Sequence, residues 1–203
     1  MVRLPLLPPG CRRHFVLEAA LLATLLAGPL PAQTPAFKDV TAATGLKSPN
    51  GAACWVDLDN DGWVDLCTTG GVWKNEQGKT FKRVADVPTS VAADFDNDGL
   101  VDLFSWSARS LFRNEGKMKF TQVKLPELPP SVSRGACWGD FNGDGFVDIY
   151  VGGYEDWGKG ITWPYQVLIS QKGKSFKLAV SKSQTRARGV TACDFDQDGD
   201  LDV

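Results

Sequence analysis

The sequence predicts an all-β protein made of repeated units. Three observations carry this prediction: a short acidic motif recurs four times, turn residues separate short apolar and β-branched segments, and no stretch after residue 36 keeps a helical period. The composition agrees, because 21 glycines and 7 tryptophans among 203 residues are typical of sheets joined by many turns. We therefore expect a repeat fold in which each unit is a small antiparallel sheet.

The acidic motif defines the repeat. It has aspartate at positions 1, 5 and 9, aspartate or asparagine at position 3, and glycine at position 6. The four copies are Asp57–Asp65 (loop 1), Asp94–Asp102 (loop 2), Asp140–Asp148 (loop 3) and Asp194–Asp202 (loop 4). Their starts are 37, 46 and 54 residues apart, so each repeat is long enough for several strands.

Turn signals place four strands in each repeat. In the first repeat we expect strands at 51–56, 64–69, 72–75 and 80–84. Four strands in about 40 to 50 residues is the size of a β-propeller blade. The predicted fold for residues 33–203 is therefore a β-propeller, incomplete in this chain, with three full repeats and the start of a fourth.

Residues 1–32 are predicted to be a signal peptide. The start is basic, residues 19–27 form an apolar run too short to span a bilayer, and residues 30–32 offer a cleavage site. Arg12 and Arg13 also resemble a twin-arginine export signal. An uncleaved N-terminal membrane anchor is the alternative. We expect a secreted or cell-envelope protein with no membrane span in the mature chain.

The charge, histidine and cysteine content exclude some classes of function and bear on disulfide formation. A formal net charge of −2 argues against nucleic-acid binding, which needs a basic excess. The single histidine, His14, lies in the predicted signal peptide, so the mature chain lacks histidine-based acid–base or triad chemistry. The mature chain keeps Cys54, Cys67, Cys137 and Cys193. Export permits disulfides, but matching positions of Cys54 and Cys137 ahead of a loop favour buried thiols.

The spacing of the carboxylates predicts metal binding. Two unit charges about 4 Å apart repel by roughly 4 kcal/mol at an effective dielectric near 20, so three acids within five residues need a cation. Glycine at position 6 permits the turn that wraps an ion, and oxygen ligands favour Ca²⁺ over zinc or copper. Aspartates that only stabilise turns are the alternative. An EF-hand would need glutamate at position 12, which here is Thr68, Ser105 or Val151.

We assign the ligands by loop position. The side-chain ligands are Asp57, Asp94, Asp140 and Asp194 at position 1; Asp59, Asp96, Asn142 and Asp196 at position 3; Asp61, Asp98, Asp144 and Asp198 at position 5; and Asp65, Asp102, Asp148 and Asp202 at position 9. The backbone carbonyls of position 7 come from Trp63, Leu100, Phe146 and Asp200. We expect position 9 to bind with both oxygens. Because affinity follows ligand charge, Asn142 predicts weaker binding at loop 3 than at loop 2.

These loops resemble the FG-GAP/VCBS repeats of integrin α-subunit-like propellers. The segment Phe37–Leu46 also resembles the start of exported bacterial proteins that join such repeats to a C-terminal ASPIC/UnbV domain. The resemblance covers residues 37–203 and implies roughly seven blades, with structural calcium in the loops and use in adhesion or surface binding. The chain has no ASPIC/UnbV segment and ends one residue after loop 4, so we expect further blades in the natural protein.

The expected function is an exported calcium-binding scaffold, an adhesion or ligand-binding module whose partner is a protein or carbohydrate at the cell surface. A carbohydrate-active enzyme, either a polysaccharide lyase or a hydrolase, is the alternative. We expect no enzyme, because no catalytic constellation is visible and the aspartates follow metal spacing. The insertion 152–165 is either a binding loop or a surface loop whose rings pack on the neighbouring blade. Glu127, Glu155 and Asp156 are interpreted as solvated surface acids.

Overall fold

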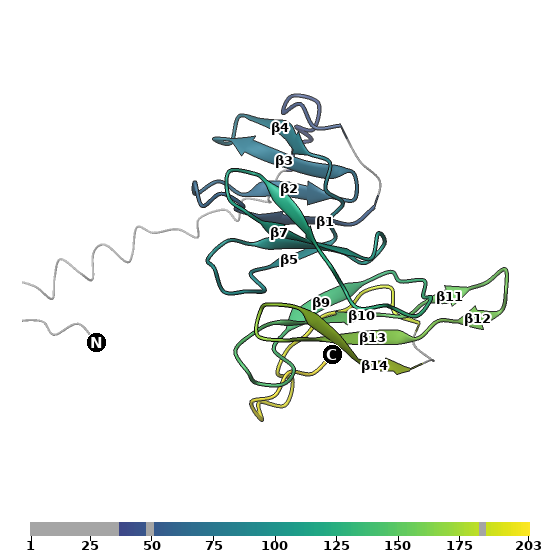
Figure 1. The fold of residues 1–203 in the computed structure, drawn as a ribbon. Helices are drawn as coiled ribbons and strands as arrows, with labels where there is room; N and C mark the ends of the chain where they lie inside the picture. Colours follow the sequence, from purple (N-terminus) through teal and green to yellow (C-terminus); the bar gives the residue numbers. More distant parts are fainter. Residues whose placement is uncertain (1–36, 48–50, 183–185) are drawn as a thin grey trace, which may run out of the picture. The chain divides into compact units, whose positions relative to one another are not determined.

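The computed structural model describes residues 37–47, 51–182 and 186–203. The predicted signal peptide lies outside these residues. The strands of the described residues all lie within the unit Asp39–Val203. The described residues form fourteen strands and no helix, so the all-β prediction is confirmed (Figure 1). It follows that no described segment is a helix able to cross a bilayer.

The first repeat folds into a four-stranded antiparallel meander. Its strands, in sheet order, are β1 (Ala53–Val56), β2 (Asp65–Thr68), β3 (Gly71–Glu76) and β4 (Thr80–Ala85). These bounds agree with the expected strands to within two residues. Gly71 makes the β2–β3 turn possible, because its φ is 133° and a Cβ there would lie 2.6 Å from the carbonyl oxygen of Ala85.

The second and third repeats form the same kind of sheet. The second contains β5 (Val91–Ala93), β6 (Asp102–Ser105), β7 (Ser110–Asn114) and β8 (Phe120–Val123), and the third contains β9 (Ala136–Gly139), β10 (Asp148–Val151), β13 (Tyr165–Ser170) and β14 (Phe176–Lys182). Their strand orders are β5-β6-β7-β8 and β9-β10-β13-β14. The first strands of successive repeats are neighbours, since β1 lies against β5 and β5 against β9. This arrangement is that of propeller blades, and no sheet among the described residues closes on itself.

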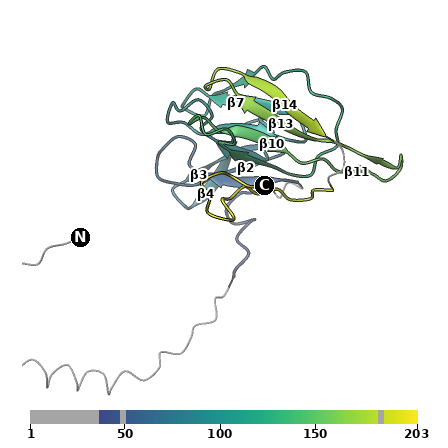
Figure 2. The ribbon, with the colours of Figure 1, turned by 90° about the horizontal axis from the view of Figure 1, so that it is seen from below.

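A short hairpin interrupts the third repeat. It consists of β11 (Glu155–Asp156) and β12 (Ile161–Thr162), which pair only with each other. Figures 1 and 2 both show this hairpin projecting away from the sheet that contains β10 and β13. The insertion predicted at residues 152–165 is therefore an excursion between the second and third strands of a blade.

The hydrophobic core lies between neighbouring blades. One cluster joins the first two repeats and includes the fully buried Leu58, Cys67 and Leu103. A second joins repeats two and three, where the rings of Phe95 and Phe176 lie 5.6 Å apart between centroids. Leu58 and Phe95 both follow position 1 of a loop, so the first two blades anchor their loops by inserting the next side chain into the core.

The fourth repeat is described from residue 186 onward only as loop 4 and one isolated bridge between Cys193 and Asp202. All four described cysteines are free thiols. Cys67 and Cys137 are buried as expected, and Cys54 is half-buried opposite Cys67 on the neighbouring strand. Cys193 is exposed, which corrects the expectation of a buried thiol there, because residues 186–203 provide no strand that covers it.

Candidate metal centres in the aspartate loops

All four loops share one set of backbone hydrogen bonds. In loop 2, the carboxylate of Asp94 accepts the N–H of Asp98 at 3.1 Å and the N–H of Gly99 at 2.9 Å. Asp98 in turn accepts the N–H of Leu100, the position-7 residue, at 2.8 Å. The equivalent bonds recur in loops 1, 3 and 4. The first and fifth positions are therefore held by the loop itself.

Two positions of each loop need the left-handed backbone region. At position 6, Gly99 has a φ of 87°, which glycine adopts without steric cost. At position 4, Asn97 has a φ of 60°, and asparagine is among the residues that tolerate this region best. In loops 1 to 3, asparagine or glycine at position 4 and glycine at position 6 therefore favour the turn without help from the rest of the blade, and in loop 4 Gln197 adopts the same φ at position 4.

The aspartate at position 9 ties loops 1, 2 and 3 to their blades. Asp102 is fully buried; its Oδ2 accepts the N–H of Phe95 at 3.1 Å and its Oδ1 accepts the N–H of Asn114 at 2.7 Å. Asp65 and Asp148 accept the same pair of bonds in their blades. Burial raises the pKa of Asp102 to about 7, and it also raises the pKa of Asp65 and Asp148. Sequence analysis did not foresee this anchoring, although each oxygen retains a second lone pair for an ion.

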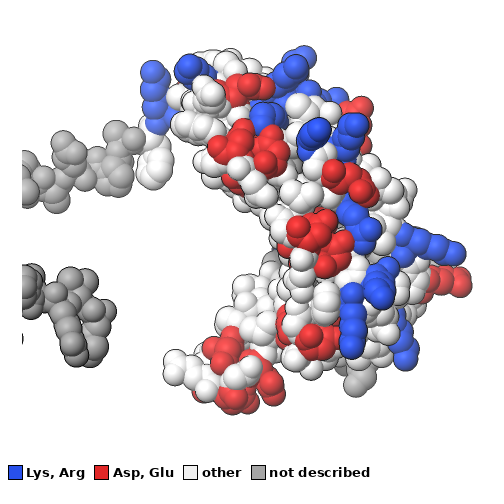
Figure 3. Space-filling view, turned by 60° about the vertical axis from the view of Figure 1, so that its left-hand side comes forward, with Lys and Arg blue, Asp and Glu red and all other residues white. Residues whose placement is uncertain are grey.

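Three loops gather carboxylates closely enough to share an ion. The groups are Asp57, Asp59 and Asp61 in loop 1; Asp94, Asp96 and Asp102 in loop 2; and Asp194, Asp196 and Asp202 in loop 4. In each group, the potential ligand atoms lie within 4.8 Å of one another. Figure 3 shows the acidic side chains collected in separate groups on the surface. Among its described residues loop 3 has no such group, and at its position 3 the amide oxygen of Asn142 accepts the N–H of Asp144 at 3.0 Å.

The donor set fits a calcium ion. At position 3, Oδ1 of Asp59 and Oδ1 of Asp96 are buried, and neither accepts a hydrogen bond. A buried carboxylate oxygen without a partner is costly, so a cation beside it would supply the missing interaction. Carboxylate and carbonyl oxygens are the ligands that Ca²⁺ prefers. The predicted ligands at positions 1 and 3 lie together in three of the loops, joined by position 5 in loop 1 and by position 9 in loops 2 and 4.

Comparison with known protein families gives one match. Residues 94–151 match a model described as an FG-GAP-like repeat. The matched segment begins at position 1 of loop 2 and ends with β10, so it contains loops 2 and 3 and the strands between them. The chain therefore contains an FG-GAP-like repeat over loops 2 and 3. No curated protein sequence matches it. The predicted FG-GAP repeats are thus confirmed, whereas the resemblance to ASPIC/UnbV-type proteins stays a prediction.

Loops 1 and 2 are each paired with a basic residue from a neighbouring strand, which sequence analysis missed. Nζ of Lys74, on β3, donates to Oδ2 of Asp59 and to Oδ2 of Asp61, the latter at 2.7 Å. Nη2 of Arg113, on β7, lies 2.7 Å from Oδ2 of Asp96. Hydrogen bonds to Asp59 and Asp61 raise the pKa of Lys74, whereas burial raises the pKa of Asp96 more than Arg113 lowers it. The sequence does mark these two basic residues, because each directly precedes the asparagine that begins the β3–β4 or the β7–β8 turn.

Neighbouring FG-GAP loops are also linked to each other. The side-chain amide of Asn60, at position 4 of loop 1, donates to the carbonyl of Gly99 in loop 2 at 3.1 Å. Asn97 repeats this bond from loop 2 to Gly145 of loop 3 at 2.9 Å. Position 4 of loop 3 is Gly143, which has no side chain to continue the series. Loops 1, 2 and 3 therefore form a hydrogen-bonded chain along the three blades.

The aromatic insertion packs against its own blade and against residues 186–188, which follow β14. Tyr154 is buried and lies between the guanidinium groups of Arg134 and Arg188, at 5.6 and 5.4 Å from the ring centroid. Tyr165 stacks on Tyr150 at 5.3 Å. Trp157, at the tip of the β11–β12 hairpin, is the exception, with 76% of its surface exposed.

One acid of this hairpin differs from its expected role. The side chain of Glu155 is only 12% exposed and pairs with Nε of Arg186, so it is not a solvated surface acid. Burying part of the carboxylate against the hairpin makes the ion pair necessary. Asp156 is also partly covered and pairs with Lys159 at 3.2 Å, whereas Glu127 is exposed as expected.

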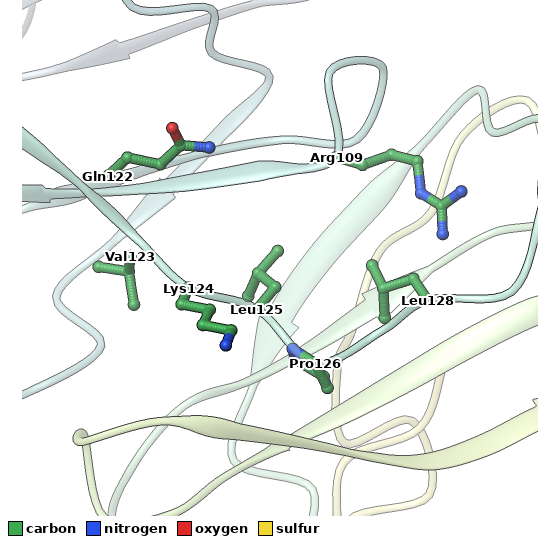
Figure 4. A pocket seen from close by; sticks show the side chains of 7 residues that line it. All are labelled: Arg109, Gln122, Val123, Lys124, Leu125, Pro126 and Leu128. Atoms are coloured by element: carbon green, nitrogen blue, oxygen red, sulfur yellow. The ribbon is translucent and has the colours of Figure 1, made fainter.

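A groove lies away from the loops, along the segment that follows β8. It is lined by Arg109, Gln122, Val123, Lys124, Leu125, Pro126 and Leu128 (Figure 4). The guanidinium of Arg109 donates to the carbonyl of Pro129 at 2.7 Å, so its charge is partly used in holding the segment. The lining contains no acidic residue, so the groove differs chemically from the aspartate loops.

Proposed function

We propose that this FG-GAP repeat protein is an exported scaffold that binds calcium in its loops and uses the ion to stabilise its blades. The observation that carries the proposal is the buried, unpartnered oxygen of Asp59 and of Asp96 within groups of three carboxylates. A bound Ca²⁺ supplies charge neutralisation at these oxygens. Because the loop already holds positions 1 and 5, little ordering remains when the ion binds.

The ion would act on stability through two connections. The aspartate at position 9 joins the loop to the third strand of its own blade, and the asparagine at position 4 joins it to the next loop. Calcium binding to the folded chain therefore stabilises both the blade and its junction with the neighbouring blade, by about 2.7 kcal/mol per site at a free concentration one hundred times Kd. Millimolar calcium outside the cell suits loops of moderate affinity.

We place the chain outside the cytoplasm, as a non-enzymatic adhesion or ligand-binding module. The single histidine, His14, precedes the blades, and most of the described acids belong to the loops or to ion pairs. The exposed Trp157 on the projecting hairpin supports a contact with a protein or carbohydrate at the cell surface, because aromatic side chains are common at such contacts.

Calcium titration tests the proposal. Isothermal calorimetry on the metal-free chain should show uptake of Ca²⁺ at up to millimolar concentration, and the melting temperature should rise with it. Asp96→Ala should remove one site. Asp86→Asn is the matched control, because Asp86 is an exposed acid outside the loops, and it should leave the uptake unchanged. An absence of calcium uptake at millimolar concentration would refute the proposed function.

Trp157→Ala tests the proposed ligand contact separately. The substitution should weaken adhesion of the chain to the surface of cells or to cell-surface polysaccharide, while its calcium uptake stays that of the unaltered chain. Unchanged adhesion would remove the hairpin from the ligand-binding surface and leave the calcium proposal intact.

A further inference from the structure

The basic residues in loops 1 and 2 occupy equivalent places in their repeats. Lys74 precedes Asn75, whose N–H binds the position-9 aspartate of loop 1, and Arg113 precedes Asn114, which does the same in loop 2. In the third repeat, the N–H that binds Asp148 comes from Ser170. The residue equivalent to Lys74 and Arg113 is therefore Ile169, which carries no charge.

Among loops 1 to 3, a basic residue is present only where position 3 is a charged aspartate. Loops 1 and 2 have an aspartate there, Asp59 and Asp96, and each is paired with the basic residue. Loop 3 has the neutral Asn142 and the neutral Ile169. Counting positions 1, 3, 5 and 9, loops 1 and 2 combine four carboxylates with one cation, and loop 3 has three carboxylates with none. All three loops thus carry the same net charge of three negative units.

We propose that Lys74 and Arg113 are built-in counter-cations, which occupy the position-3 carboxylates of loops 1 and 2 when no metal is bound and which calcium must displace. This inference rests on the proposed function. The ammonium of Lys74 contacts Oδ2 of both Asp59 and Asp61, which are predicted ligands, so the side chain and the ion compete for one set of oxygens. The guanidinium of Arg113 has a place to remain after displacement, since it lies 5.5 Å from the ring centroid of Phe95.

The competition sets an order of filling. In loops 1 and 2 the ion must displace a tethered cation, and the positive charge stays nearby and repels it. In loop 3 no side chain has to be displaced. Loop 3 should therefore fill before loops 1 and 2, which reverses the ranking expected from counting carboxylates alone.

Removing one counter-cation tests the inference, with opposite effects expected in the two metal states. Without calcium, in chelator, Lys74→Met should lower the melting temperature by about 2–4 °C, because it removes the cation that pairs with Asp59 and Asp61. With calcium, the same variant should bind at loop 1 about five- to tenfold more tightly by calorimetry. Lys82→Met is the matched control: Lys82 is the exposed cross-strand neighbour of Lys74, so its removal should change both values much less. Lys74→Gln repeats the test with a polar side chain.

A transplant into loop 3 gives the reverse test. Asn142→Asp should tighten calcium binding at loop 3, and adding Ile169→Arg to that variant should weaken it again about five- to tenfold. Calcium uptake with unchanged affinity in Lys74→Met, or weaker binding together with lower metal-free stability, would overturn the counter-cation role while the calcium scaffold stands. No calcium uptake by either the unaltered chain or Lys74→Met would overturn both proposals.

Discussion

Loop 2 and loop 4 have nearly the same sequence but very different surroundings. Both read Asp-Phe-Asp, then Asp-Gly at positions 5 and 6, and Asp at position 9. Both also make the same internal hydrogen bonds, including the N–H of Phe95 or Phe195 to the position-9 carboxylate. Yet Phe95 is fully buried, whereas 82% of the surface of Phe195 is exposed.

The difference shows which properties come from the loop sequence and which come from the surrounding blade. Loop 2 belongs to a complete four-stranded sheet, where Phe95 packs in the core shared with repeat three and Asn114 gives Asp102 a second hydrogen bond. Loop 4 has only the Cys193–Asp202 bridge in the part of the chain that is described, and Asp202 is exposed. The backbone turn is therefore local in origin, while burial, the raised pKa of Asp102 and core packing come from the blade.

The largest expected contrast between these loops concerns the phenylalanine. Phe95→Ala should lower the free energy of unfolding by about 3–5 kcal/mol, because it leaves a cavity between blades two and three. Phe195→Ala should change it by less than about 0.5 kcal/mol, since the exposed ring packs little. Urea unfolding followed by tryptophan fluorescence measures both. Equal losses would show that Phe195 is covered in solution.

A second contrast concerns the aspartate at position 9, measured in chelator so that calcium does not contribute. Asp102→Ala leaves the buried N–H groups of Phe95 and Asn114 without acceptors and should cost about 2–4 kcal/mol. Asp202→Ala removes an exposed acceptor and should cost about 0.5 kcal/mol or less. If the two costs were alike, the anchoring role of position 9 would not depend on the blade.

These contrasts also explain what could be predicted from the sequence. The loops and the strands of the first repeat were predictable because the glycine at position 6, the residue at position 4 and the flanking turns act over a few residues. The roles of Lys74 and Arg113 were not, because they pair with aspartates 15 and 17 residues away, across a blade whose register must be known first. The exposure of Cys193 was missed for a similar reason, since burial depends on neighbouring strands.

The smallest expected effect comes from the bond between neighbouring loops. Asn97→Gly removes the side chain that donates to the carbonyl of Gly145 while keeping a residue that tolerates the left-handed φ, and it should cost about 0.5–1.5 kcal/mol in unfolding free energy. Asn97→Ala adds backbone strain at the same φ of 60° and should cost about 1 kcal/mol more. The same pair of substitutions at Gln197 of loop 4 separates the two contributions, because in the described part of the chain its side chain donates to no neighbouring loop while its φ is 61°. There the change to alanine should be nearly neutral, because glutamine already carries a Cβ at this φ, and the change to glycine should shift the unfolding free energy by less than about 0.5 kcal/mol. If the glycine variants of the two loops behaved alike, the hydrogen bond between loops 2 and 3 would contribute nothing, and loop 2 would be as independent of its neighbours as loop 4.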